Sequence, residues 1–545
     1  MRIAALVNIA RRIVLVLAVL TMIPAVQAAG AGSVDPALLA SLAGSDTNAR
    51  LHAIAQLGQS SDRAAALVLE ALAGEKLFVT PDGKVLVAQT GKRAMDPVTG
   101  QEADLPAESQ AITINNRLRR AIADALAVSR LYSADAAVRL AAAKRMQQSG
   151  DASGVPLIAQ ALVKETDKQV RSALEIAQAS MELKSADPAL RRHAVEALGR
   201  TNSAAFRPVL AQMLVKDANG SYVEPYEQVR FAATVALKSI DSHLTLIEWA
   251  GNLFYGISLG SVLLLAALGL AITFGLMGVI NMAHGELLMI GAYVTYVVQM
   301  LFRQFAPAWM DWYVIAALPM AFFITAAVGM ALERTVIRWL YGRPLETLLA
   351  TWGISLILMQ AVRTIFGAQN VEVSNPSWMS GGVTVLGGLV LSYNRLAIIV
   401  FALLVVFLVW LLLNHTRLGL FVRAITQNRR MADCVGVPTG RIDMLAFGLG
   451  SGIAGLGGVA LSQLGNVGPD LGRGYIVDSF MVVVLGGVGQ LAGTVIAAMG
   501  LGGVNKFLEP SAGAVMAKIT ILVLVVLFIQ KRPQGLFAPR GRSVE

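Results

Sequence analysis

The chain contains almost no cysteine, since Cys434 is the only one in 545 residues. Disulfides within the chain are therefore excluded. Histidine is scarce as well, with five residues and no zinc-type spacing, so we expect no metal site and no cofactor. The nucleotide-binding pattern Gly-x-x-x-x-Gly-Lys-Ser/Thr does not occur. These absences argue against an enzyme, and we assign no catalytic residue.

Charged residues are also few, at 15% of the chain, whereas hydrophobic residues make up 55% and the mean hydropathy is +0.62. This balance is too apolar for a soluble protein and too polar for one buried in a membrane throughout. The net charge of +10 comes mainly from the N-terminus and from loops between apolar segments. We therefore expect a lipid bilayer, and no nucleic acid, as a partner.

The first 29 residues have the three parts of a secretory signal peptide. These are a basic start, a short apolar core and small residues at the end (Arg2, Arg11 and Arg12; 13–23; Val26 and Ala28). An uncleaved anchor is the alternative. With either outcome we expect residues 30–243 to lie outside the cytoplasm.

Residues 30–243 are rich in alanine and leucine and carry a recurring local pattern. An Asp is followed four residues later by Arg and seven later by Ala, at Asp46, Asp135 and Asp187, with weaker copies at Asp167 and Gln228. An Asp at a helix start caps the helix, and the Arg is free to pair with an acidic group of a neighbouring repeat. The pattern resembles HEAT-like helix pairs stacked into a short solenoid.

One insertion interrupts these helices. Residues 76–87 predict a β-hairpin with Pro81-Asp82-Gly83 as its turn. Residues 88–108 are polar and are expected to form a loop with a second turn at 96–100, and helices restart at Asn115. The fold class is therefore all-α with a small β-hairpin insert in the exported domain.

The remainder, residues 244–545, reads as a polytopic helical membrane domain. We expect helical spans near 250–274, 284–302, 312–333, 346–366, 393–413, 442–464, 474–487, 489–507 and 513–530. The seventh is too short to cross alone, and Gly486–Gly489 is expected to break the chain there. Nine passes take an outside N-terminus to a cytoplasmic C-terminus, and the basic clusters agree with this direction.

Glycines crowd the sixth of these segments, residues 442–464. Small residues let membrane helices approach closely, so we expect tight packing there. A pore lined by exposed backbone is the alternative.

The connection at 416–441 holds five arginines between two apolar spans, which places it in the cytoplasm. Its apolar positions Phe421, Ala424, Met431 and Val435 predict a short amphipathic helix that docks a soluble partner. An ordinary basic loop is the alternative. The order Gly419-x-x-x-Arg-Ala424, with Ala432 four residues before Gly436, resembles the coupling loop of branched-chain amino acid ABC permeases. That resemblance implies an ATPase contact made by Arg423, Ala424, Met431, Ala432 and Gly436.

Polar residues also occur at the break between the first two spans, at Asn281, His284 and Glu286. They either cap helix ends at a turn or face a polar solute at membrane depth. The segment resembles the Asn-x-Ala-His-Gly-Glu signature of the same permease group. We expect a solute path there, with Asp478 and Gln490 beside the second break facing it.

The exported helical domain joined to such a permease, with Asp96-Pro-x-Thr-Gly100 and Asn115-Asn-x-Leu-Arg-Arg120, resembles the B-type permease of bacterial urea ABC transporters. The resemblance implies an inner-membrane importer with a second related permease, two cytoplasmic ATP-binding subunits and a periplasmic solute-binding protein. Urea follows from the resemblance, while the residues indicate only a neutral solute. Branched-chain amino acids or short amides are the alternative solutes. A membrane-anchored scaffold and a passive channel are the alternatives of other classes.

Overall fold

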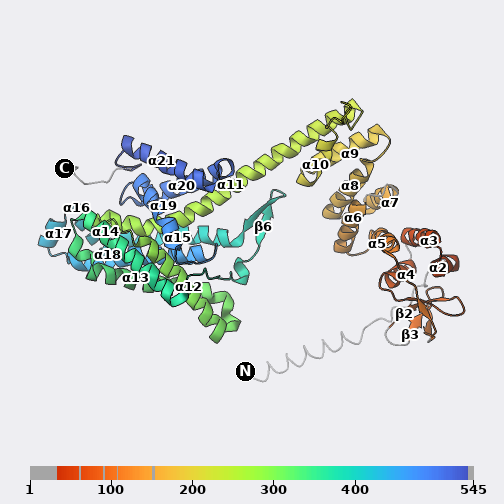
Figure 1. Ribbon diagram of the computed structural model, residues 1–545, viewed down its shortest axis with the longest axis horizontal. Coiled ribbons are helices and arrows are strands. Elements are labelled where there is room, and N and C mark those ends of the chain that lie inside the picture. The colour runs from red at the N-terminus through yellow and green to blue at the C-terminus, as the bar shows by residue number, and fades with distance from the viewer. Residues whose placement is uncertain (1–33, 61–62, 90–92, 107, 150–153, 538–545) are drawn as a thin grey trace, which may run out of the picture. The chain divides into compact units, whose positions relative to one another are not determined.

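The computed structural model describes residues 34–60, 63–89, 93–106, 108–149 and 154–537 (Figure 1). The chain is mostly helical and divides into two compact units, Met1–Leu244 and Thr245–Glu545. These are called unit 1 and unit 2 below. The expected signal segment, residues 1–29, and the basic residues Arg540 and Arg542 lie outside the described residues.

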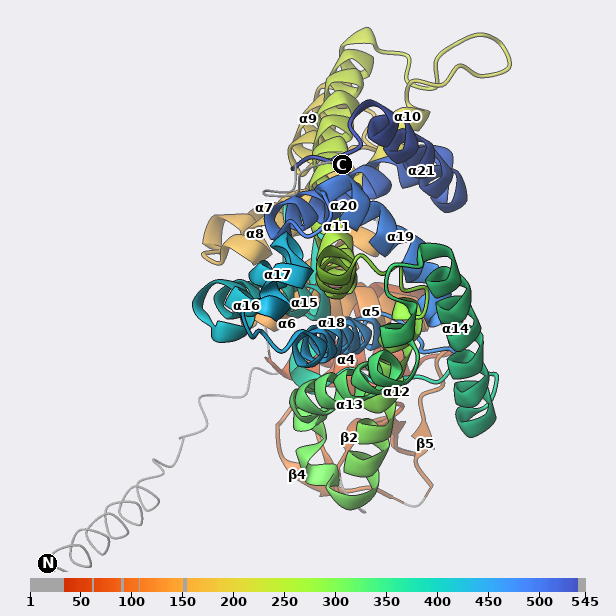
Figure 2. The same cartoon turned by 90° about the vertical axis from the view of Figure 1, so that its left-hand side faces the viewer.

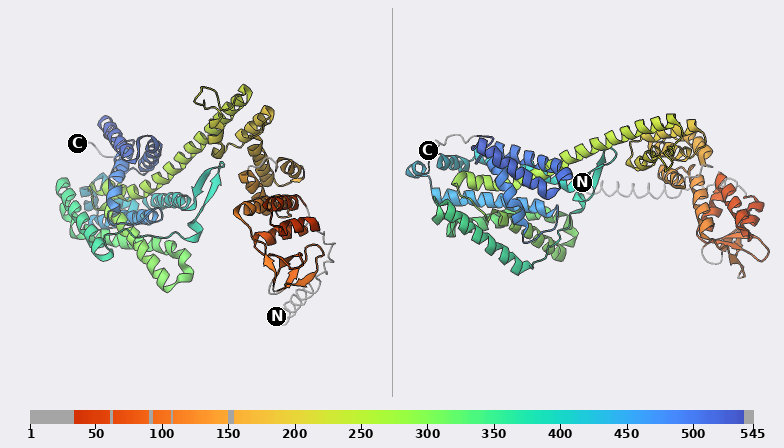
Figure 3. Two further views of the ribbon diagram at one scale, coloured as in Figure 1. Left: turned by 45° about the vertical axis from the view of Figure 1, so that its right-hand side comes forward. Right: turned by 45° about the horizontal axis from the view of Figure 1, so that its top comes forward.

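Unit 1 is built from short helices that lie side by side, α3 against α5, α6 against α8, and α8 against α9 (Figure 3, red to yellow). They are α2 Pro36–Ala43, α3 Thr47–Gln59, α4 Arg63–Ala73, α5 Asn116–Arg130, α6 Ala136–Ser149, α7 Val155–Lys164, α8 Lys168–Glu182, α9 Pro188–Arg200, η2 Ala204–Phe206 and α10 Arg207–Gln212. The expected Asp caps are confirmed. Asp46, Asp135, Asp167 and Asp187 each accept a hydrogen bond from a backbone N–H two residues further on.

Two arginines of the recurring pattern pair with an acidic group as expected, whereas Arg50 donates to the carbonyls of Gly44 and Thr113. Arg139 of α6 pairs with Glu165, which follows α7, at 2.7 Å, and Arg191 of α9 pairs with Glu224 at 2.8 Å. Each arginine also donates to the carbonyls of the loop before its own helix. One side chain therefore fixes two successive inter-helix loops, and this explains its recurrence.

The insertion is larger than the expected hairpin. Five short antiparallel strands form one sheet in the order β4-β3-β2-β1-β5. They are β1 Leu77–Val79, β2 Val85–Ala88, β3 Arg93–Met95, β4 Glu102–Asp104 and β5 Gln110–Ala111. The expected turns are confirmed, with Gly83 at φ 77° and Gly100 at φ 71°.

The expectation of a loop over residues 88–108 is wrong, because β3 and β4 lie there. Both strands have three residues, and only Ala94 among them is buried. Such strands show no alternation of apolar and polar residues for a sequence pattern to detect. They form through strand pairing instead of burial, since β3 is hydrogen-bonded to β2 and β4 to β3.

Unit 2 is a bundle of long apolar helices. Its helices are the later part of α11 Glu227–Met277, α12 His284–Phe305, η3 Pro307–Trp312, α13 Tyr313–Thr335, η4 Ile337–Leu340, α14 Pro344–Phe366, η5 Ser377–Met379, α15 Tyr393–His415, α16 Arg417–Gln427, α17 Arg429–Cys434, α18 Thr439–Ser462, α19 Leu471–Gly486, α20 Leu491–Ala512 and α21 Ala514–Lys531. A hairpin of β6 Gly382–Val385 and β7 Leu389–Ser392 precedes α15.

Eight helices in the described part of the chain are long and apolar enough to cross a membrane. A further helix, α19, has 16 residues and is too short to do so alone, as the sequence predicted. The chain breaks after it at Gly487 and Gly489, both with positive φ. Each of the nine expected segments thus corresponds to a helix of unit 2.

The glycine-rich helix α18 lies against α12 and α13 (Figure 2). A methyl group added at Gly291 of α12 would overlap the backbone of Gly455, and one added at Gly458 would overlap the Leu288 carbonyl. The glycines of α18 from Gly448 to Gly458 are buried. Close helix packing is therefore confirmed, and these glycines do not line a pore in this structure.

Candidate functional site

The break between α11 and α12 holds a buried polar cluster, which we call the α12 cluster: Asn281, His284 and Glu286. The chain turns at Gly278, with φ 64°, and re-enters the bundle so that α12 begins at His284. All three side chains are at most 2% exposed. The three side chains thus lie buried together at the break where the sequence places them.

Asn281 does serve as a local cap, because its Oδ1 accepts a hydrogen bond of 3.0 Å from the N–H of Ala283. His284 does not cap a helix. Its Nε2 lies 2.9 Å from the carbonyl oxygen of Ala266 in α11, and this contact ties the first turn of α12 to the middle of the preceding span. Of the two interpretations left open by the sequence, helix capping therefore applies to Asn281 and does not apply to His284.

Glu286 is held from a third helix, since the hydroxyl of Ser355 in α14 donates to its Oε1 at 2.9 Å. Sequence reasoning missed Ser355, because a serine on the buried side of a span looks like any small packing residue. The α12 cluster thus joins α11, α12 and α14.

Each residue of the α12 cluster keeps one buried polar atom without a hydrogen-bond partner among the described residues. These atoms are Asn281 Nδ2, His284 Nδ1 and Glu286 Oε2. Buried polar atoms in proteins are nearly always paired, so three orphans within six residues mark a place where water or a polar ligand belongs. An amide nitrogen, an imidazole nitrogen and a carboxyl oxygen together offer both donors and acceptors.

Asp478 and Gln490 were expected to face this cluster, and the structure places their side chains elsewhere. Asp478 of α19 pairs with Lys518 of α21 at 3.1 Å, beside a cavity of about 270 Å³ that Lys506 and Glu509 also line. Gln490 lines a different cavity of about 990 Å³, together with Arg423. The two breaks do meet through their backbones, because Gly275 packs directly against Gly489.

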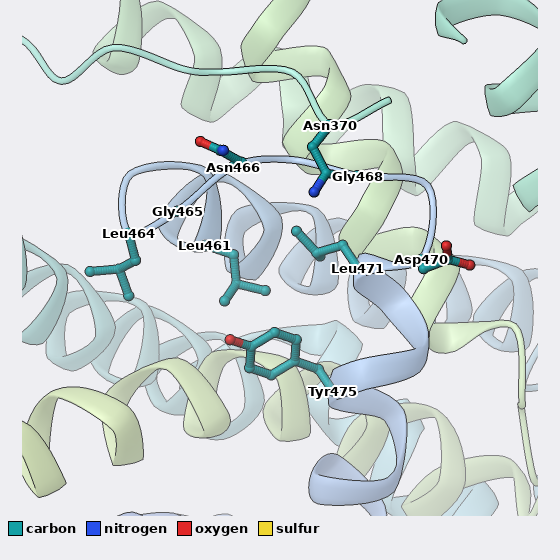
Figure 4. A pocket seen from close by; sticks show the side chains of 9 residues that line it. All are labelled: Asn370, Leu461, Leu464, Gly465, Asn466, Gly468, Asp470, Leu471 and Tyr475. Carbon is teal, nitrogen blue, oxygen red and sulfur yellow. The ribbon is translucent and has the colours of Figure 1, made fainter. Parts of the chain in front are cut away.

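A third cavity, of about 320 Å³, lies at the other end of α18 from α16 and α17 (Figure 4). It is lined by Asn370, Leu461, Leu464, Gly465, Asn466, Gly468, Asp470, Leu471 and Tyr475. Two backbone hydrogen bonds between Val371 and Val467 hold its rim, and Arg363 binds both carboxylate oxygens of Asp470 at 2.9 and 3.0 Å. The connection before α15 is therefore bound to the one before α19.

The arginine-rich connection forms two helices where one was expected. Asn428, at φ −155°, separates α16 from α17, and its Oδ1 accepts the N–H of Met431 at 3.0 Å to cap the second helix. Asparagine is a strong helix-capping residue, and this signal was present in the sequence. The apolar positions therefore do not follow a single helical period across 416–441.

The five predicted contact residues are not equally accessible. Arg423, Met431 and Gly436 are exposed and Ala424 is half-buried. Ala432 is only 4% exposed, because it packs with Val422, Ile425, Val437 and Ile442. Ala432 therefore lies inside the two-helix segment and cannot itself touch a partner in this conformation. Gly436 follows the segment at φ 88°, a backbone conformation that disfavours residues with side chains.

The outer side of the segment carries large apolar side chains. Leu420, Met431 and Val435 are 57%, 63% and 74% exposed, and we call them the outer face of α16–α17. Sequence reasoning omitted Leu420, although a single continuous helix would also have placed it on the same side as Met431. Exposed apolar side chains beside charged ones are typical of an interaction surface.

The structure is that of a polytopic helical bundle with a buried polar cluster and a two-helix segment, α16–α17, that exposes apolar side chains. Residues 252–529 match the family described as "Branched-chain amino acid transport system / permease component". Because the match covers slightly more than half of the chain, the chain belongs to this family of multi-pass membrane proteins.

Individual relatives agree with the family match. The permease protein BraD of the high-affinity branched-chain amino acid transport system of Pseudomonas aeruginosa is 29% identical over 291 residues, which cover 52% of this chain and 94% of BraD. The corresponding LivH of Escherichia coli is 28% identical over 292 residues, with the same shares. The ribose import permease RbsC of Escherichia coli is 31% identical over 134 residues, 23% of this chain and 42% of RbsC.

Proposed function

We propose that this chain is the membrane-spanning permease subunit of an ATP-driven importer and is not itself an enzyme. The observation that carries the proposal is the outer face of α16–α17, a docking segment at one end of a bundle that belongs to a transport-permease family. The proposed partners are two ATP-binding subunits on this segment, a second related permease and a solute-binding protein. The Gly436 turn and exposed Arg423 complete the proposed ATPase contact.

The proposed orientation puts α16 and α17 in the cytoplasm and unit 1 in the periplasm of a bacterial inner membrane. The arginines at 417, 423, 429, 430 and 441 support it through the excess of positive charge on cytoplasmic loops. A periplasm-dependent reporter fused after Ser242 should be active, and one fused after Arg430 should be silent. The opposite pattern would reverse the orientation.

For unit 1 we propose a HEAT-like repeat domain, residues 30–243, following a signal peptide at 1–29. The Asp caps and the Arg139–Glu165 and Arg191–Glu224 pairs support the repeat, because equivalent positions make equivalent contacts. This exported repeat domain is the feature that favours the B-type urea permease over the branched-chain amino acid permeases.

The proposed solute is urea, and branched-chain amino acids, which the names of BraD and LivH specify for those proteins, are an alternative with equal support. A neutral amide needs both donors and acceptors, and the three orphaned atoms of the α12 cluster offer both. The α12 cluster is therefore our proposed part of the solute path, and Gln490 remains a candidate through its cavity. Asp478 has its charge paired by Lys518, which weakens its candidacy.

Uptake by the complete complex in proteoliposomes tests the function and the solute together. We expect ATP-dependent uptake of labelled urea. Uptake of labelled leucine in its place would assign the branched-chain alternative, and ATP-independent flux of either solute would favour a passive channel. No uptake by a fully assembled complex would contradict the transport function.

Two substitutions test the proposed sites within this assay. Glu286→Gln should reduce uptake several-fold or more, since an unpaired buried contact costs about 1–3 kcal/mol. Glu346→Gln, at an exposed carboxylate of α14, is the matched control and should transport normally. If Glu286→Gln and Asn281→Ala both transport normally, the α12 cluster only caps and packs helices.

Met431→Glu tests the ATPase contact. It should abolish co-purification of the ATP-binding subunits, because it places a carboxylate in the centre of the outer face. The protein should remain in the membrane in normal amount, since Met431 is exposed. Retained binding of the ATP-binding subunits would remove the outer face from the proposed contact.

A further inference from the structure

Two carboxylates are buried at the end of the bundle that carries α16 and α17. Glu333 lies near the end of α13 and is 1% exposed, and Asp443 lies in the first turns of α18 and is 2% exposed. Burying a carboxylate is costly unless a positive charge or hydrogen-bond donors accompany it. The contacts of these two residues are therefore informative.

The partner of Asp443 comes from the docking segment. Arg429, the first residue of α17, forms an ion pair with the Asp443 carboxylate, and its guanidinium lies 4.7 Å from the centre of the Tyr341 ring. The hydroxyl of Tyr341 donates to Glu333 Oε1 at 3.0 Å, while Glu333 Oε2 is buried without a partner among the described residues. Arg429 thus contacts one carboxylate directly and reaches the other through Tyr341.

Asp443 sits on α18, whose glycines pack tightly against α11 and α12, the helices on either side of the break that holds the α12 cluster. A Cβ added at Gly450 would lie 2.6 Å from the Gly269 carbonyl of α11, and one at Gly269 would lie 2.9 Å from the His284 ring. Further along, Gly455 and Gly458 touch the backbone of α12. These backbones are in direct contact with no space between them, so a displacement of α18 is expected to move α11 and α12 with it.

We propose that Arg429 is a positioning residue for transport. Through Asp443 it fixes α17 to α18, and it thereby transmits movement of the docking segment to the helices that hold the α12 cluster. The Tyr341–Glu333 contact holds the guanidinium in place from the α13 side. The inference rests on the proposed transport function and adds the link between its two proposed sites.

A purely structural pair would look the same in a static structure, so the test must measure coupling. The chain offers a matched control, because Arg430 has the same charge one residue later and, like Arg429, is exposed, but it makes no ion pair among the described residues. Arg429→Gln, Asp443→Asn and Arg430→Gln are compared in the assembled complex in proteoliposomes. Three quantities are measured: bound ATP-binding subunits, ATP hydrolysed, and labelled solute transported per ATP.

We expect Arg429→Gln and Asp443→Asn to keep their ATP-binding subunits and to hydrolyse ATP, but to transport roughly tenfold less solute per ATP, within the range that removal of a coupled buried contact produces. Arg430→Gln should equal the wild type. Arg429→Lys keeps the charge but loses the planar fork and the ring contact, so it should recover part of the coupling. The double variant with Arg429→Gln and Asp443→Asn should transport little less solute per ATP than either single variant, because both changes remove the same interaction.

An unchanged ratio of solute to ATP in Arg429→Gln would overturn the proposal. Loss of assembly in both single variants would also overturn it, because the pair would then only fold the docking segment. Failure of the proposed function would show differently, as a wild-type complex that performs no ATP-dependent uptake.

Discussion

Units 1 and 2 are both helical, yet they are held together by opposite means. In unit 1, alanine and leucine faces pack between helices while Arg139–Glu165 and Arg191–Glu224 tie the loops. In unit 2, the backbones of Gly291 and Gly455 touch. In water, burial of apolar surface drives helices together. In a membrane this drive is absent, because lipid is as apolar as leucine, and helices associate instead through close backbone packing.

The buried carboxylates of the two units differ in the same way. Glu165 in unit 1 accepts hydrogen bonds from Arg139 and from two backbone N–H groups, so both oxygens are paired. In unit 2, Glu286 and Glu333 each keep one oxygen without a partner. A fully paired buried charge serves the fold, and a partly paired one marks a place where something else binds or moves.

The largest expected effect concerns the glycine contacts of unit 2. Gly455→Leu should destabilise the bundle by more than about 3 kcal/mol, because the new side chain overlaps Thr325 and the backbone of α13. Gly353→Leu in α14 is the control, since nothing lies within 4 Å of its Cβ position. Thermal unfolding in detergent measures both, and equal midpoints would show that close backbone contact does not hold unit 2.

The next effect concerns the buried pairs of unit 1. Arg139→Gln should destabilise this unit by about 3 kcal/mol or more, because it leaves the Glu165 carboxylate buried without its cation. Arg145→Gln breaks an exposed pair with Asp124 and should cost less than about 1 kcal/mol. Limited proteolysis of the whole protein at increasing urea concentrations compares the two variants. Equal sensitivity of both to the protease would show that the buried Arg139–Glu165 pair does not stabilise unit 1 more than the exposed pair does.

Acid should weaken unit 1 through the same carboxylate. The hydrogen bonds from Arg139 lower the pKa of Glu165 from 4.5 to about 2. A lowered folded-state pKa gives stability that is complete above pH 4.5 and is lost as the pH falls toward 2. Proteolytic resistance of unit 1 should fall in this window, and Glu165→Gln should flatten the dependence. An unchanged profile in that variant would assign the acid sensitivity to other groups.

The smallest effect concerns the helix caps. Asp46→Ala removes the cap of α3 and should cost about 1 kcal/mol. Asp82→Ala, in the exposed hairpin turn, should change stability by less than about 0.5 kcal/mol. A larger loss at Asp82 than at Asp46 would show that the sheet, and not the capped helices, limits the stability of unit 1.

The long spans of unit 2 could be predicted because a membrane demands about 20 apolar residues in a row, and composition alone reveals these. The capped helices of unit 1 were predictable for a similar reason, since Asp46 and Asp187 act locally. Strands β3 and β4 could not be predicted, because β3 depends on hydrogen bonds to β2 and β4 on hydrogen bonds to β3.

The candidate sites also differ in whether they depend on local sequence or on contacts between distant segments. Asn281, His284 and Glu286 were predictable because polar residues are rare in apolar segments. Their helper Ser355 and the Arg429–Asp443 pair were not, because the sequence offers no reason to choose Arg429 over Arg430. The burial of Ala432 was not predictable, because it depends on the helix break at Asn428, and the sequence analysis assumed one continuous helix.

The scarcity of cysteine gives this chain one more property. Its single thiol, Cys434, is free, exposed and at the last residue of α17, four residues after Arg430 and next to exposed Val435. A thiol-reactive fluorophore or spin label on the native chain would therefore attach at one position, with no background from other sites in this subunit. The α16–α17 segment thus carries a natural reporter of its own surroundings, in a protein whose other helices have no thiol for the same reagent.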